Sequence, residues 1–163
     1  MKDPQNIAVI GVSGYTGFEL AKILLRHPEA KSVTFYVREP QGAHCLTELF
    51  PQLRGWGQAP VRTLSVDAIA RSEAGTAFLA TPHEVSAEMA PPLLDAGLQV
   101  IDLSGAFRFR NAETFRQWYK LPTPHAARLS EAVYGLPEFY SQQIAPQLFA
   151  RAGRAGFAIT NNT

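Results

Sequence analysis

Ile7-Ala-Val-Ile-Gly-Val-Ser-Gly-Tyr-Thr-Gly17 is the segment from which the architecture of this chain follows. Four apolar residues run into glycines at positions 11, 14 and 17, and an apolar helical pattern follows from Phe18 to Leu25. Glycines at these spacings allow a sharp turn, the approach of a diphosphate and close packing of a helix on its strand. The segment therefore predicts a strand, a phosphate-binding turn and a helix, although a tight turn that binds nothing has the same local pattern.

The length and composition of the chain fit one globular domain. The 163 residues carry 15 basic and 14 acidic side chains, so the net charge of +1 gives no electrostatic reason to expect nucleic acid or an anionic membrane as a partner. The sequence has neither a run of about 20 apolar residues nor an apolar signal segment, so we expect no membrane span and a cytoplasmic protein. A single cysteine, Cys45, and scattered histidines predict neither a disulfide nor a structural metal.

Alternating strand and helix patterns extend over most of the chain. We expect strands at residues 6–12, 32–37, 61–64, 76–80, 98–102 and 156–160. We expect helices at residues 14–27, 65–70, 84–96 (interrupted at Pro91-Pro92), 111–120 and 141–150, with an irregular excursion at 39–60 and a loop at 121–125. Phe115, Trp118 and Tyr119 are the expected packing side of the fourth helix. The pattern predicts an α/β fold, a doubly wound parallel sheet forming one Rossmann-like NAD(P)-binding domain over residues 1–163.

Polar and small residues follow several of these strands, and ligands of doubly wound sheets bind at the carboxyl ends of strands. Arg38 follows the second strand, where an acidic residue favours a ribose 2′-hydroxyl and an arginine suits a 2′-phosphate. The neighbouring Glu39 makes this signal mixed, and a solvated loop arginine is the alternative. We interpret Arg38 as favouring NADP over NAD.

Four segments also match one known family: Gly11-Val-Ser-Gly-Tyr-Thr-Gly17, Thr81-Pro-His-Glu-Val-Ser86, Val100-Ile-Asp-Leu-Ser-Gly-Ala-Phe-Arg108 and Glu131-Ala-Val-Tyr-Gly-Leu-Pro-Glu138. They resemble the N-terminal half of N-acetyl-γ-glutamyl-phosphate reductase, the NADPH-dependent enzyme of arginine biosynthesis, and the last segment matches without a change. The glycine turn is shared with aspartate-semialdehyde dehydrogenases. Ala106 departs from the family, because many members have an aspartate there, so a role for that carboxylate does not carry over.

The resemblance implies a set of site residues. The expected cofactor-binding residues are Gly11, Ser13, Gly14, Tyr15, Thr16, Gly17, Arg38, Pro82 and His83. The expected substrate-binding residues are Ser104 and Arg108, and no metal ligands are expected. Asp102 is expected either to orient the substrate or nicotinamide or to cap the turn that follows its strand.

In the family, the last strand of this half leads to Asn-Pro-Gly-Cys, whose cysteine attacks the acyl phosphate to form a thioester that accepts hydride. A second domain supplies a histidine and the dimer interface. Here Phe157-Ala-Ile-Thr-Asn-Asn-Thr163 occupies that strand and stops ahead of the cysteine, so we expect no catalytic residue among these 163. Cys45 lies on the adenosine side of the expected cofactor, so we interpret it as an ordinary cysteine.

The implied partners are a small acyl phosphate in the complete enzyme and either the second domain or another copy of this chain, packed near Phe139, Phe149 and Phe157. Two other functions stay open. One is a non-catalytic NADP-binding or regulatory module. The other is a related aminoadipyl- or aspartate-semialdehyde dehydrogenase, although the segment at residues 131–138 argues against the aspartate enzyme.

Overall fold

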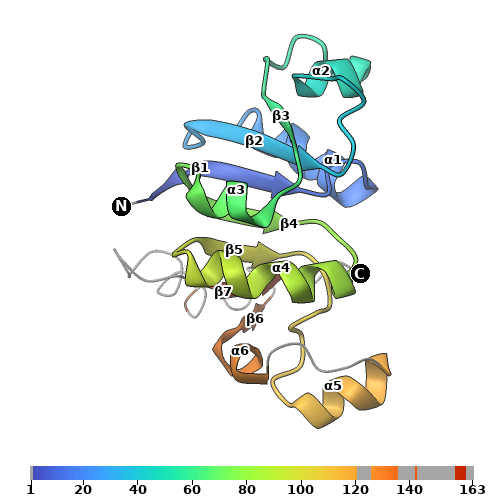
Figure 1. The fold of residues 1–163 in the computed structure, drawn as a ribbon, viewed down its shortest axis with the longest axis vertical. Coiled ribbons are helices and arrows are strands. Elements are labelled where there is room, and N and C mark those ends of the chain that lie inside the picture. The colour runs from blue at the N-terminus through green and yellow to red at the C-terminus, as the bar shows by residue number, and fades with distance from the viewer. Residues whose placement is uncertain (1, 121–125, 136–141, 143–156, 161–163) are drawn as a thin grey trace.

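The computed structural model describes residues 2–120, 126–135, 142 and 157–160 and contains a seven-stranded parallel sheet (Figure 1). The strands are β1 (Asp3–Ile10), β2 (Ser32–Val37), β3 (Val61–Thr63), β4 (Ala74–Leu79), β5 (Gln99–Asp102), β6 (Val133–Gly135) and β7 (Phe157–Thr160). Their order is β3-β2-β1-β4-β5-β7-β6, so the chain builds outward from β1 in one direction and then from β4 in the other. This reversal confirms the predicted doubly wound sheet and places its switch point between β1 and β4.

Helices cover both faces of this sheet. The helices are α1 (Tyr15–Leu24), α2 (Leu46–Leu49), α3 (Val66–Arg71), α4 (His83–Asp95), α5 (Ala112–Tyr119) and α6 (Ala126–Glu131), with a 3₁₀ turn, η1, at Pro51–Leu53. Strand β1 shows the division, because Ile7 and Val9 belong to the core cluster with α1, whereas Ala8 and Ile10 belong to the cluster with α3 and α4. Side chains alternate across a strand, so β1 is apolar on both sides, as a buried parallel strand requires.

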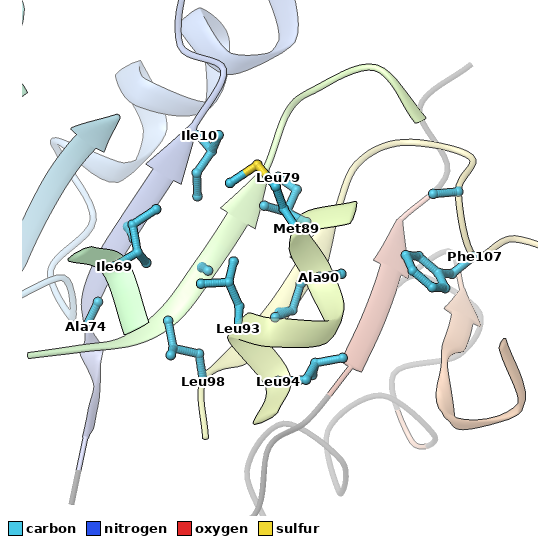
Figure 2. Close-up of a cluster of buried hydrophobic side chains, with 14 of the residues drawn as sticks. Ile10, Ile69, Ala74, Leu79, Met89, Ala90, Leu93, Leu94, Leu98 and Phe107 are labelled. Carbon is cyan, nitrogen blue, oxygen red and sulfur yellow. The ribbon is translucent and has the colours of Figure 1, made fainter. Parts of the chain in front are cut away.

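Helix α4 continues through Pro91 and Pro92, so the predicted interruption is wrong. Figure 2 labels its buried residues Met89, Ala90, Leu93 and Leu94. Each proline removes a helical N–H donor, a disruption of about 3 kcal/mol in a helix interior. Met89, Leu93 and Leu94 lie buried against the sheet, and burying one such side chain contributes about 1.5–3 kcal/mol. Packing of this face offsets the lost hydrogen bonds, a balance that the local pattern does not contain.

Several other elements expected from the sequence differ from the structure in where they begin or end. The first helix ends at Leu24 and not at residue 27, and the excursion at residues 39–60 contains α2 and η1. Neither α6 nor β6 was expected from the sequence. Trp118 is 71% exposed, because the covered face of α5 is centred on Phe115 and Tyr119, whose rings lie 4.9 Å apart. The predicted loop at 121–125, most of the predicted helix at 141–150, and Phe139 and Phe149 lie outside the described residues.

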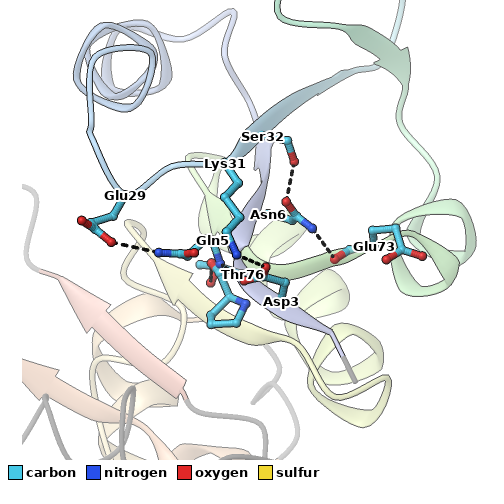
Figure 3. Close-up of polar contacts among 9 residues, drawn as sticks. Asp3, Gln5, Asn6, Glu29, Lys31, Ser32, Glu73 and Thr76 are labelled. Carbon is cyan, nitrogen blue, oxygen red and sulfur yellow. Dashed lines mark hydrogen bonds and ion pairs between the residues drawn. The ribbon is translucent and has the colours of Figure 1, made fainter.

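The amino end of the sheet is closed by polar contacts between β1 and its neighbours (Figure 3). Lys31 Nζ lies 2.8 Å from Asp3 Oδ2, and the hydroxyl of Ser32 donates to Asn6 Oδ1 at 2.9 Å. The hydroxyl of Thr76 on β4 donates to the carbonyl of Pro4 at 2.7 Å. The polar side chains at this end are thus already paired within the protein.

Candidate dinucleotide site

A cavity of about 560 Å³ opens at the carboxyl ends of β1, β2 and β4, at the switch point of the sheet. Segments that follow these three strands form most of its wall, and α2 and the first turn of α4 complete it. Its lining residues are Ile10, Gly11, Ser13, Gly14, Tyr36, Val37, Arg38, Glu39, Gln41, Leu49, Phe50, Leu64, Ala80, Thr81, Pro82 and Val85. The volume and position are those of a cleft for an extended small ligand.

Two of the glycines in the turn after β1 are required by the protein itself. Gly11 has φ +92°, and a Cβ there would lie 2.2 Å from the carbonyl oxygen of Ala80 at the end of β4. Gly17 is buried in α1, and a Cβ there would lie 2.2 Å from the carbonyl oxygen of Gly11. Any side chain at either position would push the helix or β4 away from β1. Gly17 therefore acts through packing and does not line the cavity.

The third glycine, Gly14, has no such constraint. Its φ of −82° is open to any residue, and a Cβ would meet only the carbonyl oxygen of Gly11, at an ordinary 3.6 Å. Gly14 is the N-cap of α1, so no side chain caps this helix, and its first turn carries no acidic residue. Helix α3, in contrast, is capped by the Ser65 hydroxyl, which accepts from the amide of Ala68 at 3.2 Å. The start of α1 thus borders the cavity at Gly14, and a helix N-terminus presents amide groups and a positive dipole end that suit an anion.

The far end of the cavity is formed by the segment after β2 and by α2. Arg38 and Glu39 are both exposed there, and apolar walls are supplied by Leu49, Phe50 and Leu64. Phe50 stacks on Phe18 of α1 with ring centroids 5.2 Å apart, which fixes the excursion against the first helix. None of these three was expected at the site from the sequence. Leu49 and Phe50 lie in the excursion, which carries no periodic pattern and returns to the cavity through tertiary contacts, and Leu64 directly follows β3.

His83 begins α4 close to the cavity but does not line it. Its Nε2 lies 3.2 Å from Glu84 Oε1, and its ring lies 5.2 Å from the ring of Tyr119 on α5. Tyr119 also extends over the loop after β5, since a Cβ on Gly105 would lie 2.2 Å from its hydroxyl oxygen. His83 and Tyr119 therefore join the start of α4 to α5.

The loop after β5 carries Ser104 and Arg108 outside the residues that line the cavity. The hydroxyl of Ser104 donates to Asp102 Oδ2 at 2.9 Å and accepts from the amide of Ala106 at 3.1 Å. Burial raises the pKa of the Asp102 carboxyl, although hydrogen bonds from Ser104 and Ser86 lower it in part. Ser104 is thus held within the loop, and Asp102 caps the turn, as one of the two sequence interpretations expected.

The structure brings five of the expected cofactor residues to the cavity wall: Gly11, Ser13, Gly14, Arg38 and Pro82. Tyr15 and Thr16 lie on the first turn of α1, with Tyr15 84% exposed. Among the described residues, no cluster of three or more His, Cys, Asp or Glu side chains has an arrangement that could hold a metal ion. No helix in the described part of the chain is both long enough and apolar enough to cross a membrane.

Comparison with known proteins gives the family. The family described as semialdehyde dehydrogenase, NAD binding domain, matches residues 6–147. The N-acetyl-γ-glutamyl-phosphate reductase of Akkermansia muciniphila is 45% identical over 150 residues, which cover 89% of this chain and 42% of the relative. The [LysW]-L-2-aminoadipate/[LysW]-L-glutamate phosphate reductase of Saccharolobus solfataricus is 42% identical over 144 residues, covering 88% and 40%. The chain thus spans about two fifths of the length of these relatives.

Solved structures agree on the fold. A probable aspartate-semialdehyde dehydrogenase from Pseudomonas aeruginosa superposes with a TM-score of 0.61 at 21% identity, covering 96% of this chain and 38% of that one. Because the identity is low, this likeness concerns the fold alone. The family match extends from the glycine turn through all the segments that line the cavity. The chain belongs to the semialdehyde dehydrogenase family, whose NAD-binding domain it contains, and its cofactor class is a nicotinamide dinucleotide.

Proposed function

We propose that this chain binds NADP as the cofactor part of an N-acetyl-γ-glutamyl-phosphate reductase. The observation that carries the proposal is the open space at Gly14. The fold does not need a glycine there, since a Cβ would make only an ordinary contact. A diphosphate drawn against the backbone does need it, because a side chain would hold the ligand away from the amides at the start of α1.

Arg38 supports NADP over NAD. It directly follows β2 and lines the same cavity as Gly14, at the end bounded by Leu49 and Phe50. A guanidinium can hold a 2′-phosphate through paired, charge-assisted hydrogen bonds, which a ribose hydroxyl cannot match. The adjacent Glu39 carries no positive charge for that phosphate, so we assign the selectivity to Arg38.

The names of the relatives support an acyl phosphate as the substrate. Arg108 is the proposed ligand for its anionic group, from the loop after β5. NADPH supplies the hydride of such a reduction, and a thiolate is needed to form the acyl intermediate. Cys45 is buried at the N-cap of α2, with its Sγ 3.2 Å from Thr47 Oγ1, and it does not line the cavity. We therefore propose that these 163 residues bind cofactor without turnover, in the cytoplasm.

The test is calorimetric titration of the chain with NADP⁺ and with NAD⁺. We expect Arg38→Ala to weaken NADP⁺ binding at least about tenfold, because a hydrogen bond to a charged group is worth about 1.5–3 kcal/mol. NAD⁺ binding should not change. Arg71→Ala removes an exposed arginine outside the cavity and is the matched control. Binding of neither dinucleotide would reject the function, and an equal loss for both in Arg38→Ala would reject the selectivity.

A second candidate substrate is a carrier-bound aminoadipyl or glutamyl phosphate, because the S. solfataricus relative named for it is 42% identical to this chain. This candidate uses the same cofactor site and differs in the acyl group. A protein joining this chain to the remaining part of the reductase, assayed with free N-acetylglutamyl phosphate and with the carrier-bound compound, separates the two by which is reduced.

A further inference from the structure

Asp102 is a buried carboxylate without a role in the proposed cofactor contacts. It ends β5 and is fully buried. Its Oδ1 accepts from the amide of Ser104 and its Oδ2 from the Ser104 hydroxyl, both at 2.9 Å, and the hydroxyl of Ser86 also donates to it. None of the causes of its raised pKa is a charged neighbour. Among the described residues, Ser104 and Ser86 donate to this carboxylate through an amide and two hydroxyls.

These hydrogen bonds continue to the wall of the dinucleotide cavity. The hydroxyl oxygens of Ser86 on α4 and Thr81 lie 2.8 Å apart, and Thr81 lines the cavity. A hydroxyl has one proton, and that of Ser86 is directed to Asp102, so Thr81 donates to Ser86. On the other side, the Ser104 hydroxyl accepts from the amide of Ala106 at 3.1 Å. One connected set of hydrogen bonds therefore runs from the cavity to the loop that carries Arg108.

We propose that Asp102 is a positioning residue that couples the dinucleotide cavity to the loop after β5. A dinucleotide that contacts Thr81 alters the loop at Ser104 and Ala106, and the change passes through Ser86 and the Asp102 carboxylate. Ser86 and Asp102 are fully buried, so water does not replace a donor that moves, and a shift of Thr81 requires its partners to follow. By reciprocity, an anion held on the loop would then change the affinity for the dinucleotide. This inference rests on the proposed function only for the identity of the ligand.

The first experiment follows backbone amide chemical shifts of the whole ¹⁵N-labelled chain during titration with NADP⁺. We expect Gly11 and Gly14, at the cavity, and Ser104 and Ala106, in the loop, to shift along one saturation curve. In Ser86→Ala the glycine shifts persist and the loop shifts are lost. In the matched control Ser32→Ala, an exposed serine at the far end of the sheet, both sets persist.

The outcomes separate the coupling from the proposed function. Glycine shifts without loop shifts in the unaltered chain, or loop shifts that survive Ser86→Ala, would overturn the coupling and leave dinucleotide binding intact. Asp102→Asn keeps an oxygen acceptor for the Ser104 amide, and its NH₂ group can donate to the Ser86 hydroxyl in place of the bond that Ser86 donates to the carboxylate. This variant should therefore retain the loop response, whereas Asp102→Ala should lose it. Loss in both variants with unchanged spectra elsewhere would contradict the positioning role.

A second experiment tests the connection without any ligand. As the Asp102 carboxyl titrates, followed by its own ¹³C resonance, the amides of Ser104 and Thr81 should shift with the same midpoint. In Ser86→Ala the Thr81 amide should no longer follow. Among the described residues, the other titratable and charged groups on the elements that pack here are His83, Glu84, Glu88 and Asp95 on α4, Arg108 and Arg110 on the loop, Glu113, Arg116 and Tyr119 on α5, and Arg128 and Glu131 on α6.

The contribution of His83, the neighbour nearest to Thr81 in sequence, is separated by its own ring resonances. A Thr81 amide that follows only the His83 midpoint would overturn the proposal, even if NADP⁺ did not bind at all. A Thr81 amide that shifts with the midpoint of Asp102 supports the proposal, whether or not NADP⁺ binds.

Discussion

Replacing Gly14 by alanine tests the central feature of the site, because this change affects stability and binding differently. The φ of −82° at Gly14 suits alanine, and the new Cβ would lie 3.6 Å from the carbonyl oxygen of Gly11, an ordinary van der Waals contact. Reduced freedom of the unfolded chain stabilises such a variant by about 0.4–1 kcal/mol. The poorer N-cap preference of alanine offsets this by a similar amount, so we expect a net change within about 0.5 kcal/mol.

In the proposed complex, the same Cβ would stand between the diphosphate and the amides at the start of α1. Losing one charge-assisted hydrogen bond is worth about 1.5–3 kcal/mol, so the affinity for NADP⁺ should fall by about 10- to 150-fold. Urea denaturation measures the first quantity and calorimetric titration the second. Unchanged NADP⁺ affinity in a folded Gly14→Ala protein would refute the reasoning, because the diphosphate would then not lie against this turn.

Two variants serve as references for that experiment. Ser65→Ala removes the cap of α3 and should lower the free energy of unfolding by about 0.5–2 kcal/mol without changing NADP⁺ affinity. Gly17→Ala would place a Cβ 2.2 Å from the Gly11 carbonyl oxygen, so both stability and binding should be lost together. Of these three variants, only Gly14→Ala should lose NADP⁺ affinity without losing stability.

Three further predictions concern other parts of the domain. Burial raises the pKa of Asp102 above 3.8, so the folded state binds a proton more tightly than the unfolded state does. The contribution of this group to stability therefore falls as the pH rises from about 4 through the raised pKa. In urea titrations Asp102→Asn should lack this fall, and a contribution that rises with pH would contradict the reasoning. Gly105→Ala should lower stability by about 1–3 kcal/mol, since its Cβ meets the Tyr119 hydroxyl. The double variant with Tyr119→Phe should recover part of this loss. An equal loss in the single and double variants would show that the contact is not the cause. Leu93→Ala should lower the free energy of unfolding, measured by thermal or urea unfolding, by about 2–5 kcal/mol, because the side chain is fully buried between α4 and the sheet. A decrease under about 1 kcal/mol would mean that the core is not packed as described.

The order of the first elements and the position of the glycine turn between β1 and α1 could be predicted from the residues alone. The glycines at 11, 14 and 17 act on backbone within a few residues of themselves, and alternating strand and helix patterns have only one common topology, a right-handed parallel one. The lining residues after β2 and β4 were found for a related reason, since parallel strands bring their carboxyl ends to one edge, whereas Ser104 and Arg108 after β5 do not line the cavity. Arg38 and Pro82 therefore reach the cavity as expected.

The remaining features depend on contacts between segments distant in sequence. Helix α4 passes through Pro91 and Pro92 because its apolar face is buried against the sheet. Phe50 reaches the cavity because it stacks on Phe18. The path from Thr81 to Asp102 exists because β4 and β5 are neighbours and α4 lies over them. The sequence alone determined which backbone turns and strands are possible, whereas tertiary packing decided which side chains meet, because burial energy acts over the whole domain and local preference does not.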